Sequence, residues 1–303
     1  MFFITEQVNT TEQTHGTKAR KRVAIQGVAG CFHDAAAREY FASRGIEVDT
    51  VEFDTFPALF EALRYDASLM GIVAIENTIA GSLLANHELL RASDHRIVGE
   101  WKKRISHVLC ALPGTTVDDV KEVNSHPMAL MQCEQWLQHH PSMKVVEYFD
   151  TAGSARDISQ KRLEGHAAIC GDYAAELYGL DILASGIETN KRNFTRFLIL
   201  ADPTSVSENG PSTLEINKAS LMFTLPHNKG ALSAVLAILS FYDMNLSKIQ
   251  STPIVGREWE YRFYIDVTFD NIVRYHQAVE AVRPLINDFK ILGEYCAVEN
   301  PQQ

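Results

Sequence analysis

Short apolar runs alternate with amphipathic segments from residue 23 to residue 202, and this alternation constrains the fold more than any other feature of the chain. The runs have the length of buried strands, and the segments between them show the apolar spacing of helices. A repeated strand–helix–strand order places strands side by side, with helices over the faces of the sheet. The sequence therefore predicts the α/β class with parallel sheets.

The elements that we expect in this part are short. Strands are predicted at 23–25, 48–53, 72–75, 108–112, 144–148, 167–170 and 197–200, and helices at 34–44, 56–65, 83–91, 128–139, 152–163 and 172–178.

A different order follows in the last third of the chain. Strands at 220–225, 245–254, 259–269 and 290–298 and helices at 231–241 and 272–286 give the order βαββαβ, which is the ferredoxin-like arrangement. A polar stretch with Pro203 and Pro211 separates the two patterns and has the composition of a linker. We expect a mobile tail at 1–21, a first domain at 22–202, a linker at 203–216 and a second domain at 217–303.

The net charge and the cysteines of the chain argue against several classes of partner and site. The formal net charge of −10 argues against nucleic acid or an anionic membrane as the main partner, and no apolar run approaches membrane length. The five cysteines are widely spread and lack C-x-x-C spacing, which favours reduced thiols in a cytoplasmic protein over disulfides or a metal site. We therefore expect no metal, no nucleic-acid partner and no membrane partner.

The segment Asn193-Phe194-Thr195-Arg196-Phe197 places a hydroxyl beside a guanidinium at the entrance of an apolar strand. Side chains at such a position are held rigidly and can face a cleft, which suits a proton donor beside an anion anchor. A polar strand edge is the alternative interpretation. Together with Lys191 and Arg192, Arg196 could form a local basic pocket in an acidic protein.

Two further polar groups follow predicted strands. Glu76 and Asn77 end one strand, and polar residues at the carboxyl ends of strands face the ligand crevice in open α/β sheets. Ser125 closes another short strand and precedes a predicted helix that it could cap, and Gln132 lies two turns into that helix. These side chains can orient a carboxylate or a hydroxyl group.

The turn from Gly27 to His33 follows the first strand and opens the first predicted helix. It lacks the tight G-x-G turn of a dinucleotide site. Free N–H groups at the helix start around Gly30 and Cys31 could instead bind a carboxylate, or the segment could be a simple turn.

Taken in order, these segments resemble the prephenate dehydratase family with its C-terminal ACT regulatory domain. The stretch Ser125-His126-Pro127-Met128-Ala129-Leu130-Met131-Gln132 matches every constant position of the family motif Ser-His-Pro-x-Ala-x-x-Gln, and the likeness extends from about residue 22 to about residue 298. At the turn near Gly30 the family usually has hydroxyl residues, where this chain has Cys31 and His33. The resemblance implies a two-lobed, periplasmic-binding-protein-like catalytic domain with a cleft between the lobes.

The resemblance also implies a reaction and the residues that perform it. Prephenate would lose its ring hydroxyl and a carboxylate to give phenylpyruvate, water and carbon dioxide, without a cofactor. The implied catalytic set is Thr195 as hydrogen-bond donor, proton donor or relay, Arg196 as carboxylate partner or as a residue that fixes the loop, Phe197, Glu76, Asn77, Ser125 and Gln132, with Gly30 and Cys31 binding substrate. Arogenate dehydratase is the nearest alternative, and a non-catalytic amino-acid sensor is an alternative of another class.

The second domain is expected to be regulatory. In the family, phenylalanine binds between ACT domains of two chains, which here would use Gly230, Ala231 and Leu232 with Asn245, Leu246 and Ser251, in a homodimer or homotetramer. The usual Glu-Ser-Arg-Pro is replaced by Gln250-Ser251-Thr252-Pro253. Because two charged groups are lost, we expect a weaker phenylalanine response.

Overall fold

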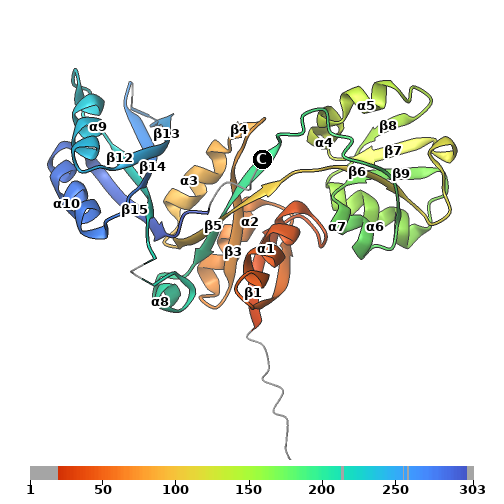
Figure 1. Ribbon diagram of the computed structural model, residues 1–303, viewed down its shortest axis with the longest axis horizontal. Coiled ribbons are helices and arrows are strands. Elements are labelled where there is room, and N and C mark those ends of the chain that lie inside the picture. The colour runs from red at the N-terminus through yellow and green to blue at the C-terminus, as the bar shows by residue number, and fades with distance from the viewer. Residues whose placement is uncertain (1–19, 213–214, 255, 258, 299–303) are drawn as a thin grey trace, which may run out of the picture.

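The structure is a computed structural model that describes residues 20–212, 215–254, 256–257 and 259–298 (Figure 1). The tail expected at 1–21 lies outside the described residues, except for its last two positions. No helix in the described part of the chain is long and apolar enough to cross a membrane.

The first lobe is an α/β layer structure built around a mixed sheet. Its strands have the order β5-β11-β3-β1-β2, with the two-residue strand β4 beside β3. Apolar clusters fill both faces of the sheet. The elements are β1 (Arg20–Gln26), α1 (Phe32–Ala42), β2 (Glu47–Phe53), α2 (Phe56–Tyr65), β3 (Met70–Asn77), β4 (Gly81–Ser82), α3 (Leu84–Ala92), β5 (Arg96–Arg104) and β11 (Phe194–Ala201).

The second lobe is inserted between β5 and β11 and has its own sheet, in the order β10-β6-β9-β7-β8. One face of this sheet packs on an apolar cluster of its own, and the other face, with Val108, Cys110 and Ala168, belongs to a cluster shared with the first lobe. Its elements are β6 (Val108–Ala111), η1 (Val117–Asp119), β7 (Glu122–Ser125), α4 (Pro127–Gln132), α5 (Glu134–Gln138), β8 (Lys144–Glu147), α6 (Thr151–Lys161), β9 (His166–Cys170), α7 (Asp172–Leu177) and β10 (Asp181–Ser185).

The structure corrects two expectations for this part. The sheets are mixed and not wholly parallel, because β11 runs antiparallel to both of its neighbours and β6 does so in the second lobe. The helix predicted at 128–139 is divided into α4 and α5, because Cys133 has the non-helical dihedral angles φ −103° and ψ 11°.

The C-terminal unit, residues 217–298, has the predicted βαββαβ order. Its four strands lie in the order β13-β14-β12-β15 and its two helices pack on one face of them. The segment predicted as a linker contains two short helical turns, η2 (Pro203–Ser205) and α8 (Val206–Asn209). The unit comprises β12 (Lys218–Thr224), α9 (Ala231–Phe241), β13 (Asn245–Pro253), β14 (Tyr261–Thr268), α10 (Ile272–Val282), η3 (Arg283–Leu285) and β15 (Asn287–Tyr295).

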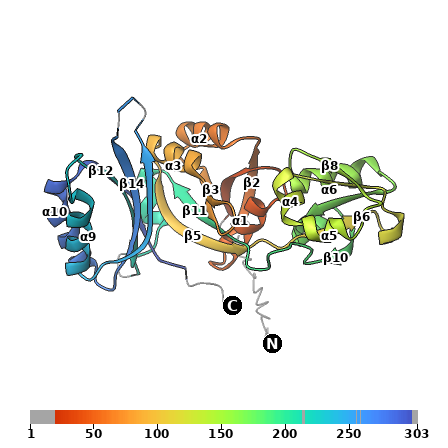
Figure 2. The same ribbon diagram turned by 90° about the horizontal axis from the view of Figure 1, so that it is seen from above.

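The C-terminal unit joins the first lobe through a continuous sheet. Strand β15 pairs with β5 at Gly293 and Ile97, where a Cβ on Gly293 would lie 2.2 Å from the Ile97 carbonyl oxygen. Only glycine allows this approach. Figures 1 and 2 show α9 and α10 on the outer side of the unit, with the second lobe at the opposite end of the molecule.

Candidate active site at the junction of the two lobes

Two chain segments connect the lobes, and they are hydrogen-bonded to each other. The outgoing segment follows β5 and the returning segment precedes β11 (Figure 1). The Ile105 N–H donates to the Asn193 carbonyl at 2.8 Å, and the Ile187 N–H donates to the His107 carbonyl at 3.0 Å. The returning segment leads directly into β11, so the start of this strand lies at the junction.

Thr195 and Asn77 meet at this junction. They are paired across β11 and β3, and Asn77 Nδ2 donates to Thr195 Oγ1 at 2.9 Å. Asn77 Oδ1 accepts from the N–H groups of Ile79 and Ala80, at 2.9 Å each. The Thr195 side chain is thus held by an amide that the backbone itself orients.

Gln132 reaches the same place from the second lobe, at the end of α4. Its Oε1 accepts from Asn193 Nδ2 at 3.0 Å and from His107 Nε2 at 2.9 Å. Asn193 Oδ1 in turn accepts from Asn77 Nδ2 at 2.8 Å. These five side chains, which we name the junction network, link both lobes in one hydrogen-bonded chain.

Sequence reasoning placed Thr195, Asn77 and Gln132 in the site but missed Asn193 and His107. Both missed side chains are almost completely buried. Burial lowers the pKa of His107, so its ring is neutral at neutral pH. The spacing of Asn193 could have identified it, because it lies two positions before Thr195 and residues two apart in an extended chain face the same side.

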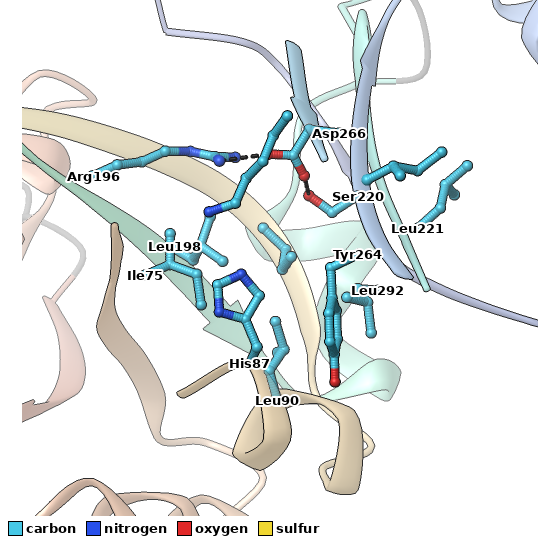
Figure 3. A pocket seen from close by; sticks show the side chains of 13 residues that line it. Ile75, His87, Leu90, Arg196, Leu198, Ser220, Leu221, Tyr264, Asp266 and Leu292 are labelled. Carbon is cyan, nitrogen blue, oxygen red and sulfur yellow. Dashed lines mark hydrogen bonds and ion pairs between the residues drawn. The ribbon is translucent and has the colours of Figure 1, made fainter. Parts of the chain in front are cut away.

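Arg196 and Glu76 do not join the network, because they lie on the opposite face of the sheet. Figure 3 shows Arg196 directed at Asp266 of the C-terminal unit. Its Nε donates to Glu100 at 2.7 Å and its Nη2 to the Tyr295 hydroxyl at 2.9 Å. The expectation that Arg196 holds a substrate carboxylate is therefore corrected: three acceptors already occupy its guanidinium.

Glu76 has the same orientation as Arg196. It accepts from Lys248 Nζ of β13 at 2.9 Å, and Arg196 Nη1 lies 3.9 Å away. Its side chain therefore contacts the C-terminal unit and not Thr195. Neighbours on a strand face opposite sides, which explains why Glu76 separates from Asn77 and Arg196 from Thr195.

The charges at this interface are balanced and mostly buried. Lys218 Nζ binds Glu100 at 2.8 Å, and Ser220 Oγ donates to Asp266. Burial raises the pKa of a carboxyl, but at Glu100 and Asp266 the charges of Arg196 and then Lys218 outweigh burial and hold the pKa below its ordinary value. The cavity beside these groups measures only about 20 Å³ (Figure 3), so the interface is a packed contact.

Phe197 is buried in the first-lobe core, on the same face of β11 as Thr195. Its ring meets that of His33 edge-on, with centroids 5.0 Å apart. Burial lowers the pKa of His33 to about 4, so this ring is neutral at neutral pH. The expected role of Phe197, lowering the local dielectric constant around the site, stays a prediction.

Ser125 lies inside the second lobe. Its hydroxyl donates to the Ile169 carbonyl at 2.6 Å, and the residue has no exposed surface. The expectation that Ser125 caps the following helix is wrong, because His126 is the N-cap and its Nδ1 accepts from the Met128 N–H.

Gly30 and Cys31 lie at the start of α1, and the N–H groups there already have partners. Gly30 N donates to Asp34 Oδ2 at 2.7 Å, and Cys31 N donates to the Val28 carbonyl at 3.0 Å. Burial raises the pKa of the Cys31 thiol, which lies 3.5 Å from the Gln26 carbonyl oxygen. An anion would meet no free N–H at these two positions.

The residues expected to bind phenylalanine are divided between the two ends of α9. Gly230, at φ +80°, precedes the helix with Ala231 and Leu232 at its start, and Asn245 and Leu246 begin the strand after its end. A helix of 11 residues is about 16 Å long. One amino acid cannot contact both ends within one chain. Ser251 lies further along β13 and is exposed.

The described residues contain no group of three or more His, Cys, Asp or Glu side chains arranged to hold a metal ion. All five cysteines are free thiols.

These features define a two-lobed α/β protein with a hydrogen-bonding site at the lobe junction and a ferredoxin-like C-terminal unit. The family model described as "Prephenate dehydratase" matches residues 23–205. The chain belongs to the prephenate dehydratase family, a family of hydro-lyases.

Individual relatives agree with this assignment. The chain is 32% identical over 299 residues to "Arogenate dehydratase/prephenate dehydratase 2, chloroplastic" of Arabidopsis thaliana, covering 95% of this chain and 76% of the relative. A prephenate dehydratase from Arthrobacter aurescens, solved in complex with L-Phe, has a TM-score of 0.78 and 27% identity and covers 92% of this chain and 93% of its own. A structure described as "GqqA- a novel type of quorum quenching acylases" has a TM-score of 0.78 and 28% identity, with 92% and 98% covered.

Proposed function

We propose that this protein converts prephenate to phenylpyruvate, with loss of water and carbon dioxide, and that the reaction takes place at the junction network. The observation that carries the proposal is the hydrogen bond from Asn77 to Thr195. Because Thr195 Oγ1 accepts from the amide, its own proton is directed elsewhere and can be donated to a leaving hydroxyl.

The chemistry needs little more than such a donor and correct positioning. The electrons of the bond to the departing carboxylate move into the ring, carbon dioxide is released, and the ring C–O bond breaks. The hydroxyl leaves as water after it receives a proton. Aromatisation drives the reaction, so the protein has to hold the dianion in a reactive conformer and assist the departing hydroxyl.

Arogenate is the alternative substrate, and the Arabidopsis relative carries both activities in its name. An amino-acid sensor is a further alternative, but a sensor does not need a buried hydroxyl oriented as a donor. An acylase needs an activated nucleophile. The Ser125 hydroxyl donates to a backbone carbonyl, and the partner of Thr195 is an amide and not a base.

The test is to incubate the purified protein separately with prephenate and with arogenate, and to follow phenylpyruvate and phenylalanine. Turnover of prephenate supports the proposal, and faster turnover of arogenate supports the alternative. No turnover of either substrate would contradict both and favour the sensor.

We further propose that the C-terminal unit is an ACT domain that binds phenylalanine between two chains and inhibits the enzyme. Support comes from the opposite ends of α9, which only a second chain could bring together around one ligand. The hydrogen-bonded pair Lys248–Glu76 connects the proposed phenylalanine site with the junction network, because Lys248 follows the start of β13 and Glu76 precedes Asn77. A homodimer or homotetramer and a cytoplasmic location remain predictions.

A further inference from the structure

We propose that Asn193 is a positioning residue: it sets which end of the Gln132 amide faces the substrate, with support from His107. This inference rests on the proposed function, because it concerns how the junction network presents donors to the reacting molecule. Neither residue donates to the substrate itself. Both act through Gln132.

The direction of every bond in the network follows from one backbone turn. The N–H groups of Ile79 and Ala80 can only donate, so the Asn77 atom that they contact must be Oδ1. Asn77 therefore presents Nδ2 to Asn193, and the Asn193 atom that accepts must be Oδ1. An amide has one oxygen and one nitrogen, so the other end of Asn193 is its donating Nδ2.

The same logic continues into the second lobe. Asn193 Nδ2 requires an acceptor, so Gln132 turns its Oε1 toward it at 3.0 Å. His107 Nε2 lies 2.9 Å from the same oxygen and must also be a donor. Two donors thus hold Gln132 Oε1. Gln132 Nε2 has no hydrogen-bond partner in the described part of the chain, and the residue is only half-buried.

The tautomer of His107 agrees with a hydrogen bond that the ring donates to Gln132 Oε1. His107 Nδ1 is buried and has no partner among the described residues, so a proton placed there would lack an acceptor. The neutral ring with its proton on Nε2 is the form that the site accommodates. The network therefore presents two donors of known direction, the Thr195 O–H and the Gln132 N–H, to the hydroxyl or carboxylate oxygens of a substrate.

Asn193→Asp tests the direction with almost no change of shape. The ionised carboxylate accepts from Asn77 but cannot donate to Gln132, so the Gln132 amide must turn its N–H group inward. We expect kcat/KM for prephenate to fall by about 10²–10³ at neutral pH, the usual loss for one oriented donor. Burial raises the pKa of the introduced carboxyl, and its protonated form donates again. The ratio of variant to wild-type kcat/KM should therefore rise as the pH falls.

Asn193→Leu is the matched control, because it removes both hydrogen bonds and cannot titrate. Its loss relative to wild type should not vary with pH. In a Gln132→Ala background, Asn193→Asp should have little further effect, since the two residues act in series. A variant-to-wild-type ratio that is flat with pH, or full additivity of the two substitutions, would overturn the proposal.

A readout that is independent of turnover separates this inference from the proposed function. The side-chain amide signals of Gln132 in ¹⁵N NMR spectra should shift as the introduced carboxyl titrates. Wild-type protein that turns over neither substrate would contradict the proposed function alone. Gln132 signals that do not respond to the titration would contradict the role of Asn193, whatever the activity.

Discussion

Thr195 and Arg196 are neighbours in the chain and face opposite sides of β11. Thr195 meets Asn77 at the lobe junction, whereas Arg196 meets Glu100 and Asp266 at the interface with the C-terminal unit. The same separation divides Asn77 from Glu76. At the scale of single residues, the pair Thr195-Arg196 looks like one catalytic unit in the sequence, but the structure divides it between the lobe junction and the interface with the C-terminal unit.

The hydroxyl of Thr195 is the group to test first. Thr195→Val keeps the shape of the side chain and removes the donor, so kcat should fall by about 10²–10⁴ with little change in fold. Thr195→Ser, the control, keeps the hydroxyl and should retain most of the activity. Steady-state kinetics with prephenate measures both, and near-wild-type turnover of the valine variant would remove Thr195 from the mechanism.

His87 predicts a dependence of stability on pH. Burial, followed by the nearby charge of Lys248, lowers the pKa of this ring from 6.5 to about 4. The unfolded chain binds the proton more readily, so the contribution is complete above about pH 6.5 and is lost as the pH falls toward 4. The loss amounts to at most about 3 kcal/mol. Urea unfolding of wild type and His87→Asn across this range should show a flatter profile for the variant; parallel profiles would contradict the assignment.

At the scale of elements, β11 and β5 form the centre of the molecule. Strand β11 holds the junction network on one face, and β5 joins the first lobe to β15. Glu100 of β5 has no exposed side-chain surface, yet it accepts from both Arg196 and Lys218. Buried carboxylates of this kind depend on their partners, because an unpaired buried charge is strongly unfavourable.

Arg196→Met should therefore act on stability. Removing the guanidinium leaves Glu100 and Asp266 buried and short of a partner, which should lower the free energy of unfolding by about 3–5 kcal/mol. Arg192→Met, an exposed arginine in the returning segment, should change it by less than about 0.5 kcal/mol. Chemical denaturation measures both. A raised KM for prephenate with an unchanged free energy of unfolding would indicate instead that Arg196 binds the substrate.

At the scale of the whole molecule, the two proposed sites lie on different units that share one sheet and one apolar cluster. Met222, Tyr264 and Tyr295 of the C-terminal unit pack with Leu198 and Leu200 of β11. A change in the C-terminal unit can therefore reach the strand that carries Thr195. Coupling of this kind is typically about 1–3 kcal/mol and is reciprocal between the two ligands.

Gly230→Val tests the phenylalanine site. A valine side chain at the start of α9 should block the ligand, so calorimetric binding and inhibition should both be lost or strongly weakened. Gly256→Val is the matched control, because both glycines have φ +80° and neither has a heavy atom within 4 Å of a built Cβ. The backbone strain is then similar in the two variants. Equal phenylalanine binding by both would contradict the proposed position.

The local sequence pattern determined the bounds of some helices and the order of elements in the C-terminal unit. Helices α2 and α9 have the bounds that the sequence predicts, because Thr55 caps α2 ahead of Pro57, and Gly230 supplies the left-handed residue before α9. The βαββαβ order of the C-terminal unit follows in the same way. The resemblance of the sequence motifs to those of the family identified Thr195, Asn77 and Gln132 as site residues.

Only the tertiary structure decided the rest. Strand β5 was not among the predicted strands. It carries the charged residues Glu100 and Lys103, and their partners Arg196, Lys218 and Glu39 lie on other elements far away in the chain. The roles of Arg196, Asn193 and His107 depend on partners that lie 25 to 116 positions away in the chain. A sequence specifies local backbone preferences directly, but the partner of a buried polar group is known only when distant segments meet, since burial is tolerated only where that partner is present.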